Sequence, residues 1–152
     1  MKQVAIAILY QQGKYLLQLR DDIPDIVYPG YWAFFGGHLE ANETPEVAVV
    51  RELYEEIRYR TSDVTLFDRF VFSPDVVRYV FYAPLTVTLD RLDLREGWDF
   101  ALWTPEEIRL GRRYSDNARQ VRAIAPPHQR ILLDFLDRIA PRLGWGDDGM
   151  MG

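Results

Sequence analysis

The sequence lacks cysteine entirely, so the chain has no disulfide bond, no thiolate metal ligand and no cysteine nucleophile. It also lacks an apolar run long enough to span a bilayer. The apolar run near the N-terminus is short and strand-like, unlike that of a secretory signal peptide. We therefore expect a cytoplasmic protein with no membrane partner.

Basic residues are also fewer than acidic residues. The 152 residues include 18 lysines and arginines against 23 aspartates and glutamates, which gives a formal net charge of −5. Affinity for a nucleic-acid backbone comes from clustered Lys and Arg, so we expect no nucleic-acid partner and no RNA-processing role. A small nucleotide substrate remains compatible with this charge.

The composition suits one small folded domain. With 152 residues, of which 48% are hydrophobic and 14% aromatic, the chain is long enough to bury one core and too short to favour two domains. We expect this single domain to cover residues 1–143. Residues 144–152 are rich in glycine and acid, and we expect them to form a disordered tail.

Hydrophobic periodicity and turn residues predict both strands and helices. Strands are expected over residues 3–10, 15–20, 31–35, 64–72, 76–87 and 98–103. Helices are expected over residues 44–57, from residue 104 onward, and over residues 127–140. This order predicts an α+β fold in which a mixed sheet lies between helices.

The helix expected over residues 44–57 has two contrasting faces. Thr44 offers a capping oxygen, and Pro45 is well tolerated in a first turn. At about 100° per residue, Glu52, Glu55 and Glu56 share an arc about 100° wide. The remaining side is apolar and is expected to be buried through Val47, Val49, Val50, Leu53, Tyr54 and Ile57.

Three carboxylates on one face repel one another, and two interpretations stay open. The face is either a solvated acidic surface or a site for a hard cation such as Mg²⁺, which prefers carboxylate oxygens. A glycine turn at Gly36 and Gly37 favours the cation, because backbone carbonyl oxygens could then approach the glutamates. Arg51 lies at the edge of the acidic stripe, where it can pair with a carboxylate and hold its rotamer.

This stretch resembles the Nudix box. In that motif a glycine is followed six residues later by a glutamate and then by an Arg-Glu-apolar-x-Glu-Glu-x-Gly-apolar segment, here Gly37, Glu43 and residues 51–59. Two positions depart from it, with Arg58 in place of the usual glycine and Tyr59 in place of an aliphatic residue. A non-glycine residue in a left-handed helix cap costs about 1 kcal/mol, so we expect an irregular helix exit at Arg58.

The resemblance implies the α/β/α sandwich of Nudix hydrolases. It also implies Mg²⁺-dependent hydrolysis of a nucleoside diphosphate linked to another group, with Mn²⁺ as a substitute cofactor, and a homodimer. The implied metal ligands are Glu52, Glu55, Glu56 and the Gly37 carbonyl oxygen. Glu52 and Glu55 would also have catalytic roles, Arg51 would orient the glutamates, and Glu43 would be structural.

Nudix hydrolases commonly use a further carboxylate outside the box as a base or an extra ligand. Glu96 is the first candidate, because such chains often have a Glu-Gly pair shortly before a strand that contains tryptophan, as Glu96-Gly97-Trp98 does here. Asp99 is the competitor. An ordinary acidic loop is the third interpretation of this segment.

Candidate substrate contacts lie outside the box. Aromatic residues concentrate just before the glycines, at Tyr28, Tyr31, Trp32, Phe34 and Phe35. Trp32 and Phe35 are our candidates for stacking on a nucleobase, although residues of this kind also suit a strand buried in the core. Arg20 and Arg78 are candidate phosphate contacts, and charged residues at solvated strand ends would look the same.

Two other functions match parts of the pattern. A catalytically silent Nudix-like module would bind a nucleotide as a sensor, but the presence of Arg51, Glu52, Glu55 and Glu56 favours catalysis. The isomerase branch of this fold relies on a catalytic cysteine, which the chain lacks. The box handles only phosphates and metal, so the sequence does not identify the group linked to the diphosphate.

Overall fold

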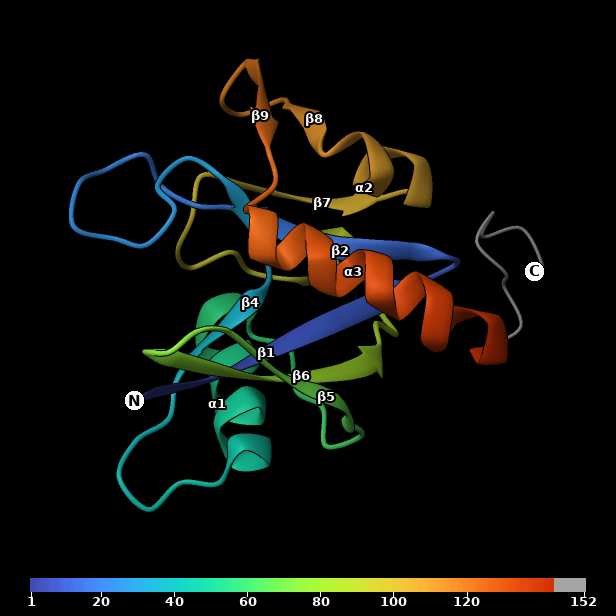
Figure 1. The fold of residues 1–152 in the computed structure, drawn as a ribbon. Helices are drawn as coiled ribbons and strands as arrows, with labels where there is room; N and C mark the ends of the chain where they lie inside the picture. Colours follow the sequence, from blue (N-terminus) through green and yellow to red (C-terminus); the bar gives the residue numbers. More distant parts are fainter. Residues whose placement is uncertain (144–152) are drawn as a thin grey trace. The chain divides into compact units, whose positions relative to one another are not determined.

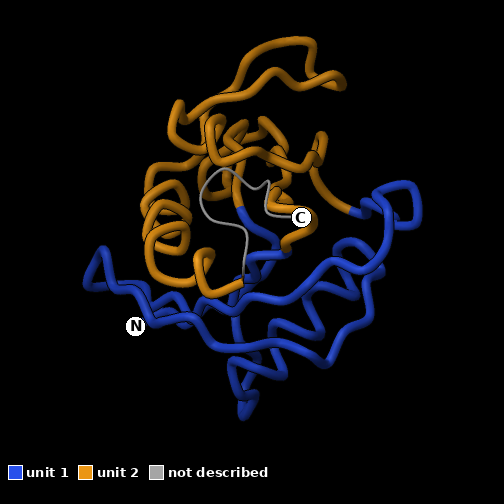
Figure 2. The backbone as a smooth tube through the Cα atoms, turned by 90° about the vertical axis from the view of Figure 1, so that its right-hand side faces the viewer, with its two compact units in different colours: residues 1–9, 34–95 blue, residues 10–33, 96–152 orange. Residues whose placement is uncertain are grey.

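The computed structural model describes residues 1–143, which contain strands, three α-helices and two short 3₁₀ helices (Figure 1). The chain divides into two compact units, which Figure 2 shows in different colours. Unit 1 comprises residues 1–9 and 34–95, and unit 2 comprises residues 10–33 and the chain from residue 96 onward. The predicted disordered tail, residues 144–152, lies outside the described residues, and the predicted single domain over 1–143 stays a prediction.

Unit 1 contains part of the β-sheet and one helix. Its elements are β1 (Lys2–Gln11, through residue 9), β4 (Phe35–His38), α1 (Pro45–Ile57), β5 (Thr65–Ser73), β6 (Val76–Pro84) and η1 (Leu89–Arg91). β1 lies between β4, with which it pairs antiparallel, and β6, and β5 pairs antiparallel with β6. Helix α1 packs against β4 and β6. Its buried apolar residues include Ala5, Ile6, Ile8, Val49, Leu53 and Ile57.

Unit 2 is built around β2. Its elements are the end of β1, β2 (Lys14–Leu19), β3 (Trp32–Ala33), β7 (Asp99–Trp103), α2 (Pro105–Leu110), β8 (Arg112–Ser115), β9 (Gln120–Ala123), α3 (Pro126–Arg138) and η2 (Ala140–Leu143). β2 pairs antiparallel with β7 along residues 15–19, and with β1 and β3 at its two ends. β8 and β9 form a separate two-stranded sheet. The largest buried side chains of this unit are Tyr15, Trp32, Trp103 and Phe135.

The observed elements confirm the predicted α+β fold with a mixed sheet, and they correct two local predictions. The strand predicted over residues 31–35 is two short strands, β3 and β4, separated by Phe34. The β8–β9 hairpin was not predicted at all. Within residues 1–143, no helix is both long and apolar enough to cross a membrane.

Candidate active site

Helix α1 begins where the sequence places it. The Thr44 side chain accepts a hydrogen bond from the Val47 N–H at 3.2 Å, and Pro45 is the first helical residue. This bond satisfies one of the backbone donors that a helix start leaves unpaired. Val47 itself is 57% exposed, contrary to the prediction that it is buried, and Ala48 is buried instead.

The two glycines before the helix lie in strand β4 and not in the predicted turn. Gly36 and Gly37 pair with Ile6 and Ala5 of β1. Gly36 has a φ of 143°, a region that favours glycine, and a Cβ there would collide with the Ala5 carbonyl oxygen. Glycine at this position therefore permits a close approach of two strands.

The glutamates of α1 face this strand to different degrees. The Gly36 N–H donates to Glu56 Oε1 at 2.8 Å. A Cβ at Gly37 would lie 2.6 Å from Glu52 Oε1, so only glycine leaves room for the Glu52 carboxylate there. Glu55 is the outermost of the three, with 53% of its side chain exposed. The structure thus places Glu52 and Glu56 close to the backbone of Gly36 and Gly37, and the predicted role of these residues and Glu55 as metal ligands stays a prediction.

Arg51 joins the helix to the loop before it. Its Nε and Nη2 donate to the two carboxylate oxygens of Glu43 at 2.7 and 2.8 Å. Its Nη1 donates to Glu52 Oε1 at 3.1 Å and to Glu55 Oε1 at 3.2 Å, and its Nη2 also donates to the His38 carbonyl oxygen. One planar guanidinium therefore sets the positions of three carboxylates, because its donors are fixed in a fork.

The partner in the loop, Glu43, is only 8% exposed at its side chain. Its pKa is lowered to about 2, first by the hydrogen bonds from Arg51 and then by the Glu40 N–H, which donates at 2.9 Å. The same pairing raises the pKa of Arg51 above its usual range. Glu43 therefore stays ionised and holds Arg51 in place.

A divalent cation suits the chemistry of this helix face. Glu52, Glu55, Glu56 and the Gly37 carbonyl offer only oxygen atoms, which Mg²⁺ prefers, and the absence of a side chain at Gly37 lets the Glu52 carboxylate lie close to this backbone. Among residues 1–143, no three His, Cys, Asp or Glu side chains are arranged as a ready ligand cluster. Arg51 draws Glu52 and Glu55 toward itself, whereas the Gly36 N–H draws Glu56.

The helix exit is regular despite its two unusual residues. Arg58 adopts the left-handed conformation, with φ 55° and ψ 31°, and its N–H donates to the Tyr54 carbonyl oxygen at 2.9 Å. The Arg58 guanidinium lies 4.9 Å from the Tyr54 ring centroid. Tyr59 is buried, its hydroxyl donates to the Pro84 carbonyl oxygen at 2.9 Å, and it accepts from the Thr86 N–H at 3.0 Å. The contacts of Arg58 with Tyr54 and of Tyr59 with Pro84 and Thr86 thus stabilise a helix exit at which glycine is usual.

Glu96 and Asp99 differ in their surroundings. Asp99 accepts hydrogen bonds from the Ser115 hydroxyl at 2.7 Å and from the Asn117 side chain at 3.3 Å, so it anchors the β8–β9 hairpin. Glu96 is exposed, and no side-chain hydrogen bond holds it within residues 1–143. The backbone just before Glu96 is fixed, because the Arg95 N–H donates to the Glu56 carbonyl oxygen at 2.8 Å.

The candidate substrate contacts divide by burial. Trp32 and Phe35 are 0% and 1% exposed, so neither offers an open ring face to a base in this structure. Arg20 is half-buried at the end of β2, and its backbone N–H donates to the Tyr31 carbonyl oxygen. Arg78 is half-buried on β6, where its guanidinium lies 5.9 Å from the Phe72 ring centroid.

Sequence reasoning missed the residues that hold the β8–β9 hairpin. Ser115 and Asn117 lie at its turn and bond to Asp99. Arg122, on β9, donates to Asp22 at 2.7 Å. The signal available in the sequence was the Asp116-Asn117 pair, which favours a turn, followed by the run of residues 120–123, which alternates in polarity.

Residues 1–124 match the family model of the NUDIX domain. The chain belongs to the Nudix family. This Nudix chain is 56% identical over 39 residues to an 8-oxo-dGTP diphosphatase of Proteus vulgaris, a match that covers 26% of the chain and 35% of that protein. It is 34% identical over 76 residues to the nucleoside triphosphatase NudI of Enterobacter sp. (strain 638), covering 49% and 52%. The Nudix chain thus spans 35% and 52% of the lengths of these curated relatives.

The fold is similar to that of a solved structure. The crystal structure of a MutT protein from Methanosarcina mazei Go1 matches with a TM-score of 0.67 and 20% identity, over 90% of this chain and 93% of that one. At this identity the likeness shows the fold alone. The family match confirms the predicted Nudix membership, and the structural match confirms the predicted α+β sandwich.

Proposed function

We propose that this Nudix hydrolase cleaves the pyrophosphate bond of a nucleoside diphosphate linked to another group, with Mg²⁺ as cofactor. The observation that carries the proposal is the single face of α1 on which Arg51 binds Glu52 and Glu55, with Glu56 bonded to the Gly36 N–H and the Glu52 carboxylate lying close to the Gly37 backbone. The names of the two curated relatives, a diphosphatase and a triphosphatase, support nucleoside triphosphates as the first substrates to test.

The roles of the residues follow from their chemistry. Glu52, Glu55, Glu56 and the Gly37 carbonyl would hold the cation, and Arg51 would keep the carboxylates in register. When bound, Mg²⁺ neutralises phosphate charge and lowers the pKa of a nearby water. Water attacks phosphorus, the anhydride P–O bond breaks, and the products are two phosphate esters or, from a triphosphate, a monophosphate and pyrophosphate. Arg20 and Arg78 are proposed to contact the substrate phosphates.

We propose Glu96 as the group that accepts the proton of the attacking water. Asp99 suits this role less, because its carboxylate already accepts hydrogen bonds from the hairpin turn. Glu96→Gln is expected to lower kcat by at least about tenfold, because a general base typically contributes about 10²- to 10⁴-fold. Glu106→Gln, at an exposed glutamate of α2, is the control. If turnover by Glu96→Gln equals that of the wild type, the assignment is wrong.

The deciding experiment is a substrate panel with Mg²⁺ or Mn²⁺ that identifies products as well as rates. It should include dGTP, 8-oxo-dGTP, ADP-ribose, a nucleotide sugar and a dinucleoside polyphosphate. Glu55→Gln should abolish turnover of the best substrate, whereas Glu46→Gln, on the first turn of the same helix, should retain it. The alternative, a silent nucleotide sensor, would show thermal stabilisation by a nucleotide without Mg²⁺-dependent hydrolysis of any member of the panel.

A further inference from the structure

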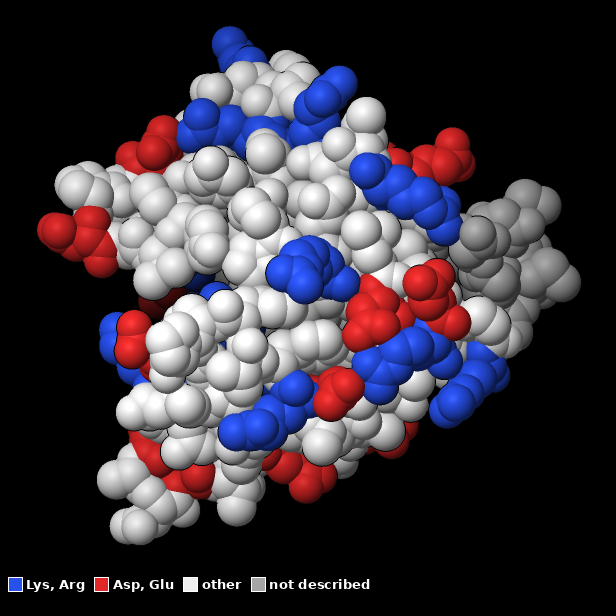
Figure 3. Space-filling view, viewed as in Figure 1, with Lys and Arg blue, Asp and Glu red and all other residues white. Residues whose placement is uncertain are grey.

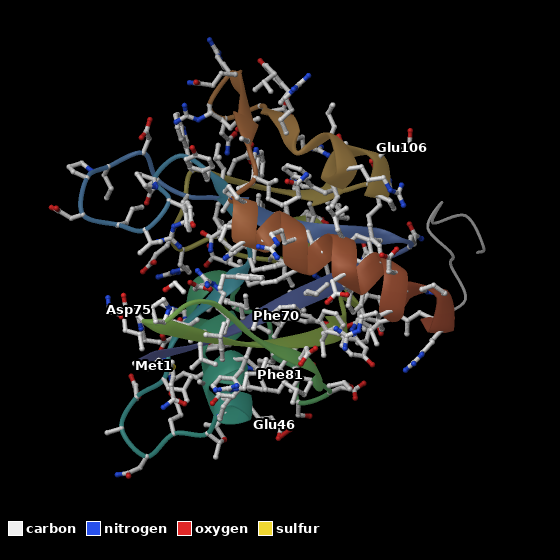
Figure 4. All side chains as sticks on the ribbon, in the orientation of Figure 1. Met1, Glu46, Phe70, Asp75, Phe81 and Glu106 are labelled. Carbon is white, nitrogen blue, oxygen red and sulfur yellow. The ribbon has the colours of Figure 1, made fainter. Side chains whose placement is uncertain are left out.

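The β8–β9 hairpin has two faces with different surroundings. Arg113 pairs with Arg122 across the hairpin, and Tyr114 pairs with Val121. Tyr114 and Val121 are more than half exposed, and Arg112 lies on the same open face. Arg113 and Arg122 are half-buried and turn toward the rest of unit 2. Figure 3 shows basic side chains gathered over these strands.

Arg122 contacts segments that are far apart in the sequence. Its Nη2 donates to Asp22 at 2.7 Å, in the loop between β2 and β3. Its guanidinium lies 5.3 Å from the ring centroid of Trp98, in the turn before β7. The absence of a side chain at Gly30 makes room for it, because a Cβ there would overlap Nη2. Arg122 therefore fills the space between the loop and the turn.

The loop of residues 21–30 needs such an anchor. Ile23 and Val27 are 51% and 63% exposed, so the middle of the loop contributes little to the core. Its two ends are joined by the hydrogen bond from the Gly30 N–H to the Asp21 carbonyl oxygen, at 3.2 Å. The ion pair between Arg122 and Asp22 lies beside this closure, so it fixes the loop relative to β9.

The same hairpin also fixes the turn that carries Glu96. The Asn117 side chain donates to the Trp98 carbonyl oxygen at 3.0 Å, and the Ser115 hydroxyl donates to Asp99 at 2.7 Å. Glu96 lies two residues before Trp98. The loop held by Arg122 follows directly on Arg20. The hairpin therefore supports the segments next to Arg20 and Glu96, the two residues of unit 2 to which the proposed function gives a role.

We propose that Arg122 is a positioning residue for the nucleotide substrate. It pre-organises the loop of residues 21–30 against the Trp98 turn, so that less conformational entropy is lost when substrate binds. This inference rests on the proposed function, because it assigns Arg122 an effect on the affinity for the substrate of that reaction.

Arg122→Ala is expected to raise KM for the preferred nucleoside triphosphate, dGTP or 8-oxo-dGTP, by about fivefold while kcat changes by less than about twofold. The KM of Arg122→Lys should lie between those of the wild type and Arg122→Ala, because lysine keeps the charge beside Asp22 but lacks the planar face that stacks on Trp98. Arg112→Ala is the matched control, since Arg112 lies on the open face of the same hairpin, and its KM should equal that of the wild type.

Hydrogen exchange of residues 21–30 without nucleotide provides a readout that does not need activity. Exchange should be faster in Arg122→Ala than in Arg112→Ala. If Arg122→Ala does not fold, Asp22→Asn serves in its place, because it removes the acidic charge from the same ion pair. It should also raise the KM and speed the hydrogen exchange of residues 21–30. A wild type without hydrolytic activity would overturn the proposed function. Two results with an active wild type would overturn this inference alone. One is a KM that is unchanged in both Arg122→Ala and Asp22→Asn. The other is an effect of Arg112→Ala equal to that of Arg122→Ala.

Discussion

At the scale of single residues, Arg51 connects several groups in and beside the box. It forms a two-point ion pair with Glu43 and also bonds to Glu52, Glu55 and the His38 carbonyl. A lysine could not reproduce this pattern, because its ammonium is a single point of charge without a planar fork. The geometry of the proposed metal ligands therefore depends on the charge of Glu43, which keeps Arg51 in place.

The low pKa of Glu43 predicts a specific loss of stability in acid. A group whose pKa falls on folding contributes stability above its unfolded pKa, and this contribution is lost as the pH falls. For Glu43 the window lies between 4.5 and about 2. In urea unfolding experiments across this pH range, the free energy of unfolding of Glu43→Gln should fall less steeply with decreasing pH than that of the wild type. Glu46→Gln, at an exposed glutamate, should follow the wild type, and an unchanged slope in Glu43→Gln would contradict the prediction.

Tyr59 provides a second test at this scale. Tyr59→Phe removes a buried hydroxyl that bonds to Pro84 and Thr86, and the lost hydrogen bonds should cost about 1–2 kcal/mol in the free energy of unfolding. Tyr54→Phe is the control and should change stability by less than about 0.5 kcal/mol. Chemical denaturation of the two variants measures the difference, and equal stabilities would show that water replaces the Tyr59 partners at no cost.

The sequence predicted some of these residue roles and not others. The pairing of Arg51 with a carboxylate of α1 followed from helical spacing, because residues one turn apart share a face. Its stronger pairing with Glu43 was not predicted, because the path of the loop between β4 and α1 has no period that spacing can reveal. The hydrogen bonds of Tyr59 were missed for a similar reason, since Pro84 and Thr86 lie in a different part of the chain.

At the scale of elements, the ends of the helices follow from local chemistry, whereas short strands depend on tertiary contacts. Thr44 and Thr104 both accept the hydrogen bonds expected of helix caps. The β8–β9 hairpin escaped prediction because each strand has only four residues and its stability comes from contacts such as Ser115 with Asp99. Gly36 was misassigned to a turn because its need for glycine arises from the approach of β1.

The exit of α1 allows a test in which opposing effects can be weighed. Arg58→Gly removes a left-handed non-glycine residue, worth about 1 kcal/mol. It also loses the stacking on Tyr54 and makes the unfolded chain more flexible, each worth about 0.5–1 kcal/mol. The two losses together equal or exceed the gain, so we expect the free energy of unfolding to fall by about 0–1 kcal/mol.

The control for this prediction is Arg58→Val, which keeps the left-handed strain, adds a β-branched side chain and loses the stacking. It should destabilise the protein by about 1 kcal/mol or more relative to Arg58→Gly. Equal stabilities of the two variants, measured by chemical denaturation, would show that the backbone at residue 58 relaxes to another conformation.

At the scale of the whole molecule, the fold class was predictable and the division of the chain was not. Strand periodicity and the helix starts led to an α+β fold, and the match of residues 1–124 to the family model agrees with it. The two compact units could not be predicted, because each is assembled from segments distant in sequence, and only tertiary contacts reveal that grouping.

The proposed cation site predicts a global effect. Mg²⁺ that binds only the folded state at about 100 times its dissociation constant should add about 2.7 kcal/mol of stability, raising the melting temperature by about 5–10 °C. Glu56→Gln should reduce this rise, although a glutamine can still accept the Gly36 N–H. NaCl at equal ionic strength controls for screening. A rise of equal size in Glu56→Gln would show that Glu56 is no ligand.

The alternation of the two units along the chain has a consequence for biosynthesis. The polypeptide passes from unit 1 to unit 2 after Leu9, returns at Phe34 and crosses again after Arg95. The ribosome therefore completes the last segment of unit 1, with the whole Nudix box, before it starts the last segment of unit 2. During this interval residues 10–33 have already been made but lack β7, the strand that pairs with β2 along residues 15–19. A nascent chain stalled shortly after Arg95 would thus contain every residue of the proposed metal site, while its apolar strand β2 would still lack its main partner.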